Sequence, residues 1–469
     1  MTWHLNHPVH GVKPRPVQVE ALRRADGYAK FGHWLEQGLG KTALNLNEFI
    51  EQDDTEINVV IAPNSFVGDW VIAPEEWGVS WLKTGMRRRD PLPGDADQFM
   101  LYVVNYEYVR DKTANRALQK LMDRRPCMLT IDESTCVKNP NTSTFKAVIE
   151  LAKRAKVVRE LNGTPLTQDV RDYYGQLRCL GQLGGMEYTV FRNRFCEMGG
   201  FYDKQVVGTR NEQELGRILD GCTFRALKKD WRKDLPPKMY KQVHLEMSKR
   251  QLQHYSTMME EFYALVEDEE ISVELVLTQM GKLRQISSCI LMDKGKHWFF
   301  EEPKDNPKLK AVLDIGSTCP GKFIVSHFYR PSGDLLFDAL TKAGYNPARI
   351  KGGMKPEEIL EQKRMFNDDG SCRAIVGQQE ATGRGHTLIG KSGRDRCSTM
   401  IFYENDFSYY WRSQMEDRNY GRDEESIGTL VYDLVTSPMD AKGIDILTKK
   451  RDLASMMDDI VATVRGQRK

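Results

Sequence analysis

The 469-residue chain lacks the features that mark secreted, membrane-spanning and zinc-binding proteins. Its nine cysteines are scattered, with no C-x-x-C pair and no His/Cys spacing suited to zinc. Dispersed, unpaired thiols in a large chain are typical of a reducing compartment. Residues 1–10 show no basic-then-apolar signal pattern, and no apolar run approaches membrane-spanning length. We therefore expect an intracellular protein with no membrane partner.

A strong net charge is also lacking, as are internal repeats and low-complexity tracts. The formal net charge is +2, so the overall charge hardly indicates a polyanionic partner. Apolar residues make up 40% and charged residues 29% of the chain, which is ordinary for a globular protein. The length suffices for two or three domains with cores of their own.

Short β-rich runs alternate with helical patterns in both halves, which predicts parallel sheets built from βαβ units. The expected strands are residues 31–35, 58–62, 101–104, 127–131 and 157–161, and then 322–326, 374–376, 399–403 and 430–435. Pro236-Pro237 predicts a hinge, because consecutive prolines end regular structure. Residues 240–290 have a helical pattern without strand signals. The predicted fold class is α/β, with two parallel-sheet lobes in tandem and helical insertions.

The run Gly38-Leu39-Gly40-Lys41-Thr42 follows an apolar strand and opens a helical pattern. In this arrangement backbone N–H groups and a helix N-terminus surround a phosphate. Lys41 would reach the β- and γ-phosphates, and the Thr42 hydroxyl would hold Mg²⁺. The full P-loop pattern has a glycine where this chain has Leu35, so the match is partial. The alternative is a plain strand-to-helix turn rich in glycine.

A second motif ends the apolar run at residues 127–131, where Asp132 and Glu133 stand side by side. Two adjacent carboxylates at the end of a buried strand are costly unless a metal or a reaction uses them. Asp132 can hold the Mg²⁺ that Thr42 contacts, and Glu133 can orient and deprotonate the attacking water. The alternative is a solvated Asp-Glu turn, which the P-loop upstream disfavours.

Polar residues follow other expected strands, in loops where parallel sheets usually bind ligands. Ser65 follows the second strand and Asn105 the third, and both can donate to a phosphodiester backbone. Turn residues look the same, so this alternative stays open. Upstream, Gln18 can pair with the donor and acceptor edges of adenine, and we assign the nearby Arg15 to the nucleotide as well.

Four segments resemble motifs Q, I, II and III of the superfamily two helicases: Gln18, Gly38-Leu39-Gly40-Lys41-Thr42, Asp132-Glu133-Ser134-Thr135 and Asn162-Gly163-Thr164-Pro165. Three further segments resemble the Swi/Snf-like branch of DNA translocases: Lys138-Asn139, Asp234-Leu235-Pro236-Pro237-Lys238 and Leu283-Arg284-Gln285-Ile286. The chain departs from the family at Thr135, where His is common, and at Asn162, where Thr is usual.

The second half carries further segments similar to this family. Lys351-Gly352-Gly353 resembles an accessory motif, and residues 381–388, with Thr382 and Gly385, resemble motif V. Residues 414–418 resemble motif VI, whose arginine would be Arg418, with Arg422 one turn later on the same helix face. An arginine supplied across the cleft stabilises charge as the γ-phosphoryl group leaves. The family spaces its two arginines by three residues rather than four, and Arg418 could instead pair with neighbouring carboxylates.

The resemblance implies two RecA-like lobes with ATP and Mg²⁺ between them. Residues 1–235 would form the ATP-binding lobe, 236–305 a helical insertion or linker, and 306–469 the C-terminal lobe. Gly385 would meet the nucleotide, and Thr164, Gly353 and Thr382 the nucleic acid, with DNA favoured over RNA. The implied activity is a DNA-dependent ATPase that moves along or remodels DNA.

The alternatives are an RNA helicase and a non-catalytic nucleic-acid scaffold that keeps the fold. Thr135 and Asn162 give the scaffold slight support, whereas Lys41 and Glu133 argue against it. No chromatin-reading, zinc or nuclease module is recognisable, and this compactness suggests a viral or bacterial origin. We accordingly expect a monomer in the cytoplasm of a bacterial or virus-infected cell.

Overall fold

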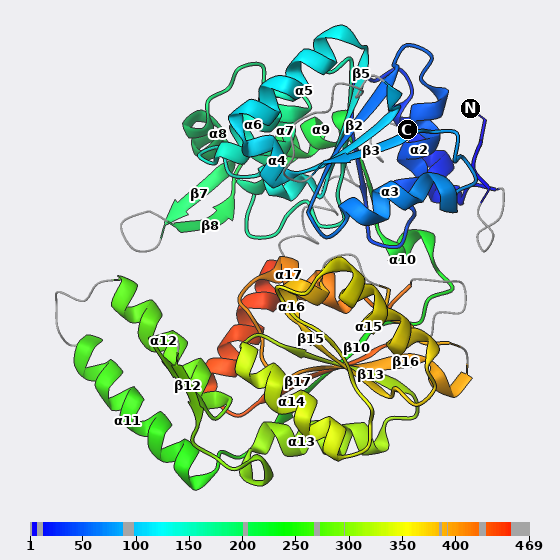
Figure 1. Cartoon of the computed structure of the whole chain (residues 1–469). Helices are drawn as coiled ribbons and strands as arrows, with labels where there is room; N and C mark the ends of the chain where they lie inside the picture. Colours follow the sequence, from blue (N-terminus) through cyan, green and yellow to red (C-terminus); the bar gives the residue numbers. More distant parts are fainter. Residues whose placement is uncertain are drawn as a thin grey trace. The chain divides into compact units, whose positions relative to one another are not determined.

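The structure, a computed structural model, describes residues 2–6, 13–87, 98–199, 205–266, 273–294, 296–383, 387–391, 393–421 and 428–451. The chain forms two compact units, the first reaching to Lys233 and the second comprising Asp234–Lys449 (Figure 1). Each unit is an α/β layer structure around its own parallel sheet. The predicted fold class, two parallel-sheet lobes in tandem, is therefore confirmed.

The first unit is built on seven parallel strands in the order β3-β4-β2-β5-β6-β1-β9. Their bounds are β1 Lys30–Leu35, β2 Ile57–Ala62, β3 Thr84–Arg87, β4 Leu101–Asn105, β5 Cys127–Asp132, β6 Val157–Leu161 and β9 Thr223–Ala226. Because every pairing is parallel, the carboxyl ends of all seven strands lie at one edge of the sheet. The predicted P-loop, acidic pair and polar loops all follow strands at this edge.

Helices cover both faces of this sheet (Figure 1). They are α1 Pro16–Ala25, α2 Lys41–Glu51, α3 Val67–Glu76, α4 Tyr106–Arg110, α5 Lys112–Arg124, α6 Ser143–Ala152, α7 Asp172–Cys179, α8 Tyr188–Phe195, α9 Glu212–Cys222 and α10 Lys228–Trp231. Side chains alternate between the faces along β2: Val59 and Ile61 pack with α4 to α9, whereas Val60 packs with α2 and α3. An antiparallel hairpin, β7 Cys196–Gly199 with β8 Gln205–Thr209, follows α8.

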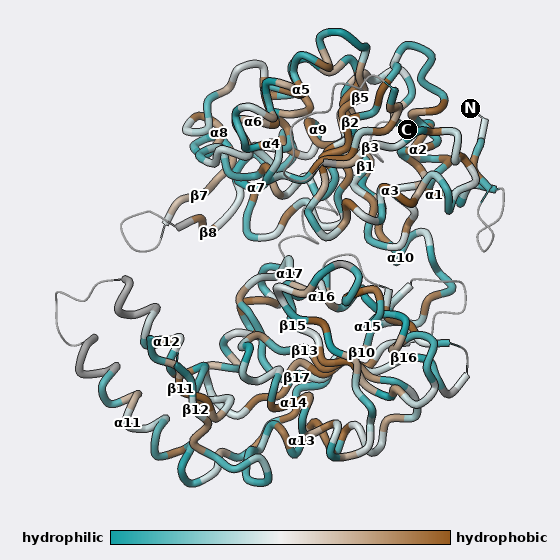
Figure 2. Tube along the Cα trace, viewed as in Figure 1, coloured by the Kyte–Doolittle hydropathy of each residue, from teal (hydrophilic) through white to brown (hydrophobic). Residues whose placement is uncertain are grey.

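The second unit has six parallel strands in the order β10-β17-β16-β13-β15-β14. Their bounds are β10 Met239–His244, β13 Lys322–His327, β14 Ala348–Ile350, β15 Ala374–Gln378, β16 Cys397–Phe402 and β17 Leu430–Val435. Along β13, Phe323 and Val325 pack on one face and Ile324 on the other. Figure 2 shows the apolar residues of this unit concentrated along the strands.

The helices of the second unit are α11 Lys249–Val266, α12 Val273–Ser287, α13 Pro307–Thr318, α14 Arg330–Lys342, α15 Pro356–Asp368, α16 Gln379–Thr382 and α17 Tyr409–Glu416. Proline stands at the first position of α13 and α15, where its missing N–H has no intrahelical partner to lose. Helices α11 and α12 pack on each other and lead into the small hairpin of β11 Ile290–Asp293 and β12 Lys296–Phe299. In the described part of the chain, no helix combines the length and apolar character needed to cross a bilayer.

Each expected strand matches a strand of one of the two large sheets, with ends shifted by at most a few residues. The expectation of a strand-free region over residues 240–290 is wrong, because Met239–His244 form β10. This strand lies at the sheet edge, and its side chains are mostly exposed, so it carries no apolar run. Strands β3 and β9 are likewise edge strands that were not predicted.

Beneath α2, a carboxylate is buried between an arginine and a histidine. Glu48 of α2 accepts from Arg159 of β6, with Nε to Oε1 at 2.6 Å. Its Oε2 lies 2.8 Å from His33 Nε2 of β1, and all three side chains are buried. Burial alone would raise the pKa of Glu48, but Arg159 and His33 lower it to about 2. This buried cluster holds α2 against β1, which leads into the predicted P-loop, and against β6, which leads into the segment that resembles motif III.

Glu48→Gln should destabilise the first unit by about 3–5 kcal/mol at pH 7, because Arg159 would stay buried without its charge partner. Urea unfolding followed by circular dichroism measures this loss. The Glu48 pKa is depressed on folding, so its contribution is present above the ordinary value of 4.5 and lost as pH falls toward about 2. The variant should therefore lose less stability than the wild type as the pH falls through this range.

Glu51→Gln is the matched control, since Glu51 lies on the same helix and pairs with His4 at the surface. A surface pair contributes at most about 1 kcal/mol. Equal losses for the two variants would contradict the role given to the buried cluster.

Candidate functional site

The loop between β1 and α2 has the backbone shape of a phosphate-binding loop. Gly38 and Gly40 have φ values of 82° and 81°, which only glycine adopts without strain. A Cβ at residue 40 would lie 2.5 Å from Gln18 Nε2, so a side chain there is also excluded by space. Lys41 begins α2, and its Nζ donates to the Leu35 carbonyl at 2.9 Å. The Lys41 side chain therefore folds back over the loop in which a phosphate would bind.

Arg15 and Gln18 both bind the carbonyls of this loop. Arg15 Nη1 donates to Gly38 O at 2.7 Å, and Gln18 Nε2 donates to Gly40 O at 3.0 Å. The other end of the Gln18 amide accepts from the Arg15 backbone N–H at 2.8 Å. The Gln18 amide keeps one more N–H and one more lone pair that could bind a ligand. Its contact with adenine therefore stays a prediction. The structure adds that Arg15 and Gln18 both donate hydrogen bonds to backbone carbonyls of the loop between β1 and α2.

The acidic pair lies at the carboxyl end of β5, next to the strand that leads into motif III. Asp132 is buried, and its Oδ2 accepts from Trp70 Nε1 at 2.8 Å, while its Oδ1 accepts from the Glu133 N–H at 3.0 Å. Burial raises the pKa of Asp132, and the Trp70 hydrogen bond and the Lys41 charge oppose that rise. Asp132 is the register partner of Leu161 at the end of β6, and a Cβ on Gly163, two residues later, would lie 3.5 Å from Lys41 Nζ. The acidic pair and the P-loop lysine therefore lie on either side of the same loop.

Glu133 has a left-handed backbone, with φ of 52°, and its side chain is buried. A non-glycine residue in this region carries strain on the order of 1–3 kcal/mol, which surrounding contacts must hold in place. Tyr106 supplies such a contact, because its hydroxyl donates to the Asp132 carbonyl at 2.7 Å. Such strain is typical of a residue whose side-chain direction matters to function.

Asn162, which stands where the family has Thr, is joined to the acidic segment through a buried network. Its Nδ2 donates to Ser134 Oγ and to Gln176 Oε1, each at 2.9 Å, and Ser134 donates to the same Gln176 oxygen at 2.8 Å. Its Oδ1 accepts from the Thr164 N–H at 2.9 Å. At the next residue, a Cβ on Gly163 would lie 3.5 Å from Lys41 Nζ. The loop after β6 therefore reaches both the acidic segment and the P-loop lysine.

The donor set in the first unit suits a magnesium–nucleotide complex. Thr42 offers a hydroxyl and Asp132 a carboxylate, the hard oxygen ligands that Mg²⁺ prefers together with water and phosphates. Lys41 and the N-terminus of α2 face the same loop and suit phosphate oxygens. Among the described residues, no group of three or more His, Cys, Asp or Glu could hold a metal by itself.

Most of the side chains assigned to nucleic acid are buried within the protein. The Ser65 hydroxyl is buried without a hydrogen bond in the described part of the chain. Asn105 accepts from the Tyr108 N–H at 2.7 Å, and the Thr164 and Thr382 side chains are buried. Gly353 is exposed, with φ of 91°. Their backbone groups rather than their side chains are thus the natural contacts, and the assignments stay predictions.

In the second unit, Arg418 lies just after α17 and its side chain is fully buried. Its Nε donates to the Gln414 carbonyl at 2.6 Å and its Nη2 to the Gln414 side chain at 3.2 Å. The two other predicted residues of this half, Gly385 and Arg422, lie outside the described residues.

The acidic residues beside Arg418 have other partners. Glu416 accepts from Arg412 Nε at 2.6 Å and from the Tyr240 hydroxyl at 2.8 Å. Lys238, just before β10, lies 3.0 Å from Asp417 Oδ1. Arg412 also pairs with Asp433 of β17, and burial, which alone would lower the pKa of Arg412, is outweighed by these two carboxylates, which raise it. These pairs fix α17 to two strands of the second sheet.

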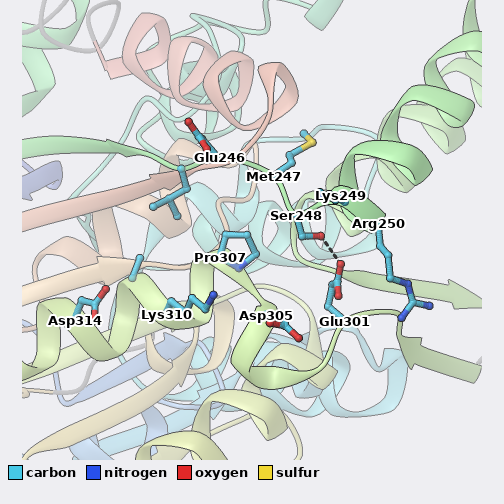
Figure 3. A pocket seen from close by; sticks show the side chains of 12 residues that line it. Glu246, Met247, Ser248, Lys249, Arg250, Glu301, Asp305, Pro307, Lys310 and Asp314 are labelled. Atoms are coloured by element: carbon cyan, nitrogen blue, oxygen red, sulfur yellow. Dashed lines mark hydrogen bonds between the residues drawn. The ribbon is translucent and has the colours of Figure 1, made fainter.

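A cavity of about 620 Å³ lies elsewhere in the second unit (Figure 3). Its lining comes from the chain after β10 and from α13, and it includes Lys249, Arg250 and Lys310 as well as Glu301 and Asp305. The Ser248 hydroxyl donates to Glu301. None of the lining residues belongs to a predicted motif, and charges of both signs lie side by side.

Three residues that bind the motif residues were not found from the sequence. They are Trp70 of α3, Tyr106 of α4 and Gln176 of α7, each of which bonds to residues 132–134 or 162. A buried indole N–H, phenol or amide must find a partner, and this requirement was the available signal. The sequence does not reveal which groups these three side chains bond to.

The fold is that of an α/β protein with two parallel sheets, and the segments predicted to bind nucleotide in the first unit lie at one edge of its sheet. A family model, SNF2-related domain, matches residues 35–290, more than half of the chain. The chain therefore belongs to the SNF2-related domain family, and its resemblance to the Swi/Snf-like branch of superfamily two is confirmed.

Several known proteins are similar to this chain. DNA annealing helicase and endonuclease ZRANB3 of Homo sapiens is 21% identical over 435 residues, covering 88% of this chain and 37% of that protein. The ISWI chromatin-remodeling complex ATPase CHR11 of Arabidopsis thaliana is 27% identical over 417 residues, covering 82% and 36%. The chain thus spans well under half the length of these relatives. The solved Sulfolobus solfataricus SWI2/SNF2 ATPase core in complex with dsDNA is 20% identical, with coverage of 99% and 97% and a TM-score of 0.43.

Asn162→Ala should lower the free energy of unfolding of the first unit by about 1–3 kcal/mol, because Ser134, Gln176 and the Thr164 N–H would lose a buried partner. Thermal or urea unfolding measures the change. Asn141→Ala is the control, since Asn141 is exposed and its side chain makes no hydrogen bond that the described structure contains. That variant should stay within about 0.5 kcal/mol of the wild type. An Asn162→Ala protein as stable as the Asn141→Ala protein would refute the structural role of the network.

Proposed function

We propose that the protein is an ATP-dependent DNA translocase that couples hydrolysis of Mg²⁺-bound ATP to movement along, or remodelling of, DNA. The observation that carries this proposal is that the loop after β6 links the other two motifs at the carboxyl edge of the first sheet: Asn162 donates to Ser134, next to the acidic pair, at 2.9 Å, and a Cβ on Gly163 would lie 3.5 Å from Lys41 Nζ. A phosphate loop, a buried acidic pair and a third loop linked to both are the parts that nucleotide hydrolysis requires. Membership of the SNF2-related family supports the choice of DNA as the track.

The residues of the first unit divide the chemistry between them. Lys41 would leave the Leu35 carbonyl and bind phosphate oxygens, where its charge offsets theirs. Thr42 and Asp132 would hold the magnesium ion, which when bound neutralises charge on the phosphates. Glu133 would orient the attacking water and accept its proton. Arg15 and Gln18 would keep the loop in shape through Gly38 and Gly40.

Arg418 of the second unit is proposed to supply positive charge to the leaving γ-phosphoryl group, with Arg422 and Gly385 as further candidates. This role requires the guanidinium to exchange its bonds with Gln414 for bonds with phosphate oxygens. A planar fork of donors suits such an exchange, because it can bind two oxygens at once. Gain and loss of that contact with each nucleotide would switch the grip on DNA.

The proposed DNA contacts are the loops of Ser65, Asn105 and Thr164 in the first unit and of Gly353 and Thr382 in the second. Because the side chains of Asn105, Thr164 and Thr382 are buried, their contacts would come from backbone groups to phosphates. Binding should therefore depend little on sequence and fall steeply with salt.

ATP turnover with single-stranded, double-stranded and branched DNA, and with RNA, is the direct test. DNA should stimulate hydrolysis, and raising the salt should reduce the stimulation by weakening DNA binding. Greater stimulation by RNA would favour an RNA helicase. The absence of stimulation by any nucleic acid would overturn the proposal.

Glu133→Gln should lower ATP turnover by about 10²–10⁴-fold, because the amide cannot take the proton of the attacking water. Binding of the magnesium complex of a fluorescent ATP analogue should persist, which separates loss of chemistry from loss of the fold. Glu107→Gln is the control, as Glu107 is an exposed acid of the same unit. Wild-type turnover in the Glu133→Gln protein would instead favour a scaffold that does not use this site.

Arg418→Lys should reduce DNA-stimulated turnover by about 10³–10⁵-fold if the guanidinium acts on the transition state. Lysine keeps the charge but cannot offer the fork. Single-turnover hydrolysis measures the effect, and circular dichroism checks that the buried substitution leaves the second unit folded. A folded variant with turnover close to wild type would remove Arg418 from the proposed mechanism.

A further inference from the structure

Two loops that are proposed to contact DNA are each followed, within five residues, by an aromatic residue that bonds to the acidic pair. The loop after β2 contains Ser65 and leads into α3, whose Trp70 donates to the Asp132 carboxylate at 2.8 Å. The strand β4 ends at Asn105, and the next residue, Tyr106, donates to the Asp132 carbonyl at 2.7 Å. Asp132, at the end of β5, therefore accepts one hydrogen bond from the residue that follows each loop, Trp70 or Tyr106.

The link from the first loop to Asp132 is short and rigid. Phe66 precedes α3, and its carbonyl accepts from the Trp70 N–H at 3.0 Å, so the first helical turn joins the loop to the indole. Trp70 is buried with 2% of its surface exposed, and its ring lies in the core cluster that contains α2 and α3. Because the core around the indole is close-packed, a shift of the loop must also shift the Trp70 N–H relative to the Asp132 carboxylate.

The second link is built in a similar way. The Asn105 side chain accepts from the Tyr108 N–H at 2.7 Å and so fixes the start of α4, where Tyr106 stands. Tyr106 is also buried, with 5% exposed. Its bond holds the carbonyl that precedes Glu133, the residue with the left-handed backbone. Movement of this strand end would act on the strained peptide that aims the Glu133 side chain.

The two loops are joined to each other as well. Asn105 Nδ2 donates to the Asn64 side chain at 3.1 Å, and Asn64 is an exposed residue of the first loop. A phosphodiester backbone that displaces either loop thus displaces both. The hydrogen bonds of Trp70 to the Asp132 carboxylate and of Tyr106 to the Asp132 carbonyl would then change together.

We propose that Trp70 and Tyr106 are positioning residues that transmit nucleic-acid binding from the two loops to the magnesium-binding and water-activating pair Asp132-Glu133. The proposal rests on the proposed function, because it takes DNA binding by these loops as given. Neither aromatic residue touches the substrate. Each acts by setting the direction of an acidic group that does.

The test measures the coupling between DNA and nucleotide by binding alone. The affinity for a fluorescein-labelled DNA duplex is determined by anisotropy, with and without Mg²⁺ and a non-hydrolysable ATP analogue. The ratio of the two affinities is the coupling factor, which is typically about 5–150 where two sites communicate. By reciprocity, DNA must change the affinity for the magnesium–nucleotide complex by the same factor, and Mn²⁺ resonance in the presence of the analogue reports it independently.

Tyr106→Phe removes only a hydroxyl and should reduce the coupling factor by about two- to tenfold, as expected for one neutral hydrogen bond. Trp70→Phe removes a donor to a charged group and should abolish most of the coupling, with a loss of about tenfold or more. The affinity for DNA without nucleotide should stay within about twofold of wild type in both, since neither residue is proposed to touch DNA.

Tyr174→Phe is the matched control, because its hydroxyl donates to the Met186 carbonyl at 3.2 Å in the same unit, away from the acidic pair. It should keep the wild-type coupling factor. Should Trp70→Phe fail to fold, Tyr106→Phe decides the question. Wild-type coupling in a folded Tyr106→Phe protein overturns the inference and leaves the proposed function standing. Absence of both coupling and stimulation in the wild type itself overturns the proposed function.

Discussion

The first unit depends on burying charged groups at the ends of its parallel strands. An ionised carboxylate such as Asp132 is unfavourable in a protein interior unless donors or a cation compensate it. Here the indole of Trp70 and the N–H of Glu133 donate to the Asp132 carboxylate, and with the charge of Lys41 they oppose the rise in its pKa that burial causes.

The same constraint recurs away from the acidic pair. Glu48 is held between Arg159 and His33 under the P-loop helix, and Arg412 between Glu416 and Asp433 beside motif VI. In each case a helix that carries or directly precedes predicted site residues is held on its sheet by a buried charge pair as well as by apolar packing. Buried pairs contribute little net stability, but they penalise any other arrangement strongly, so they fix position.

The central strands and the nucleotide motifs could be predicted because their signals are local. Apolar runs mark β2 and β5, and glycine with lysine marks the P-loop, since backbone shape and phosphate charge demand those residue types. Edge strands such as β10 were missed because a mostly exposed strand needs no apolar run. Trp70 and Tyr106 were missed for a different reason. Their roles depend on partners far along the chain, and no spacing rule encodes them.

Strand β10 has β17 as its neighbour in the second sheet and lies at the sheet edge, although the two strands stand near opposite ends of this unit's sequence. A ribosome synthesises β10 long before β17, so the earlier strand must wait, unpaired, until nearly the whole unit has been made. Closing so long a loop is slow, because the chain loses its entropy before it gains the pairing. The second unit can therefore complete its sheet only after synthesis has passed β17, and the lysine and histidine of β10 help to protect its open edge from wrong partners in the meantime.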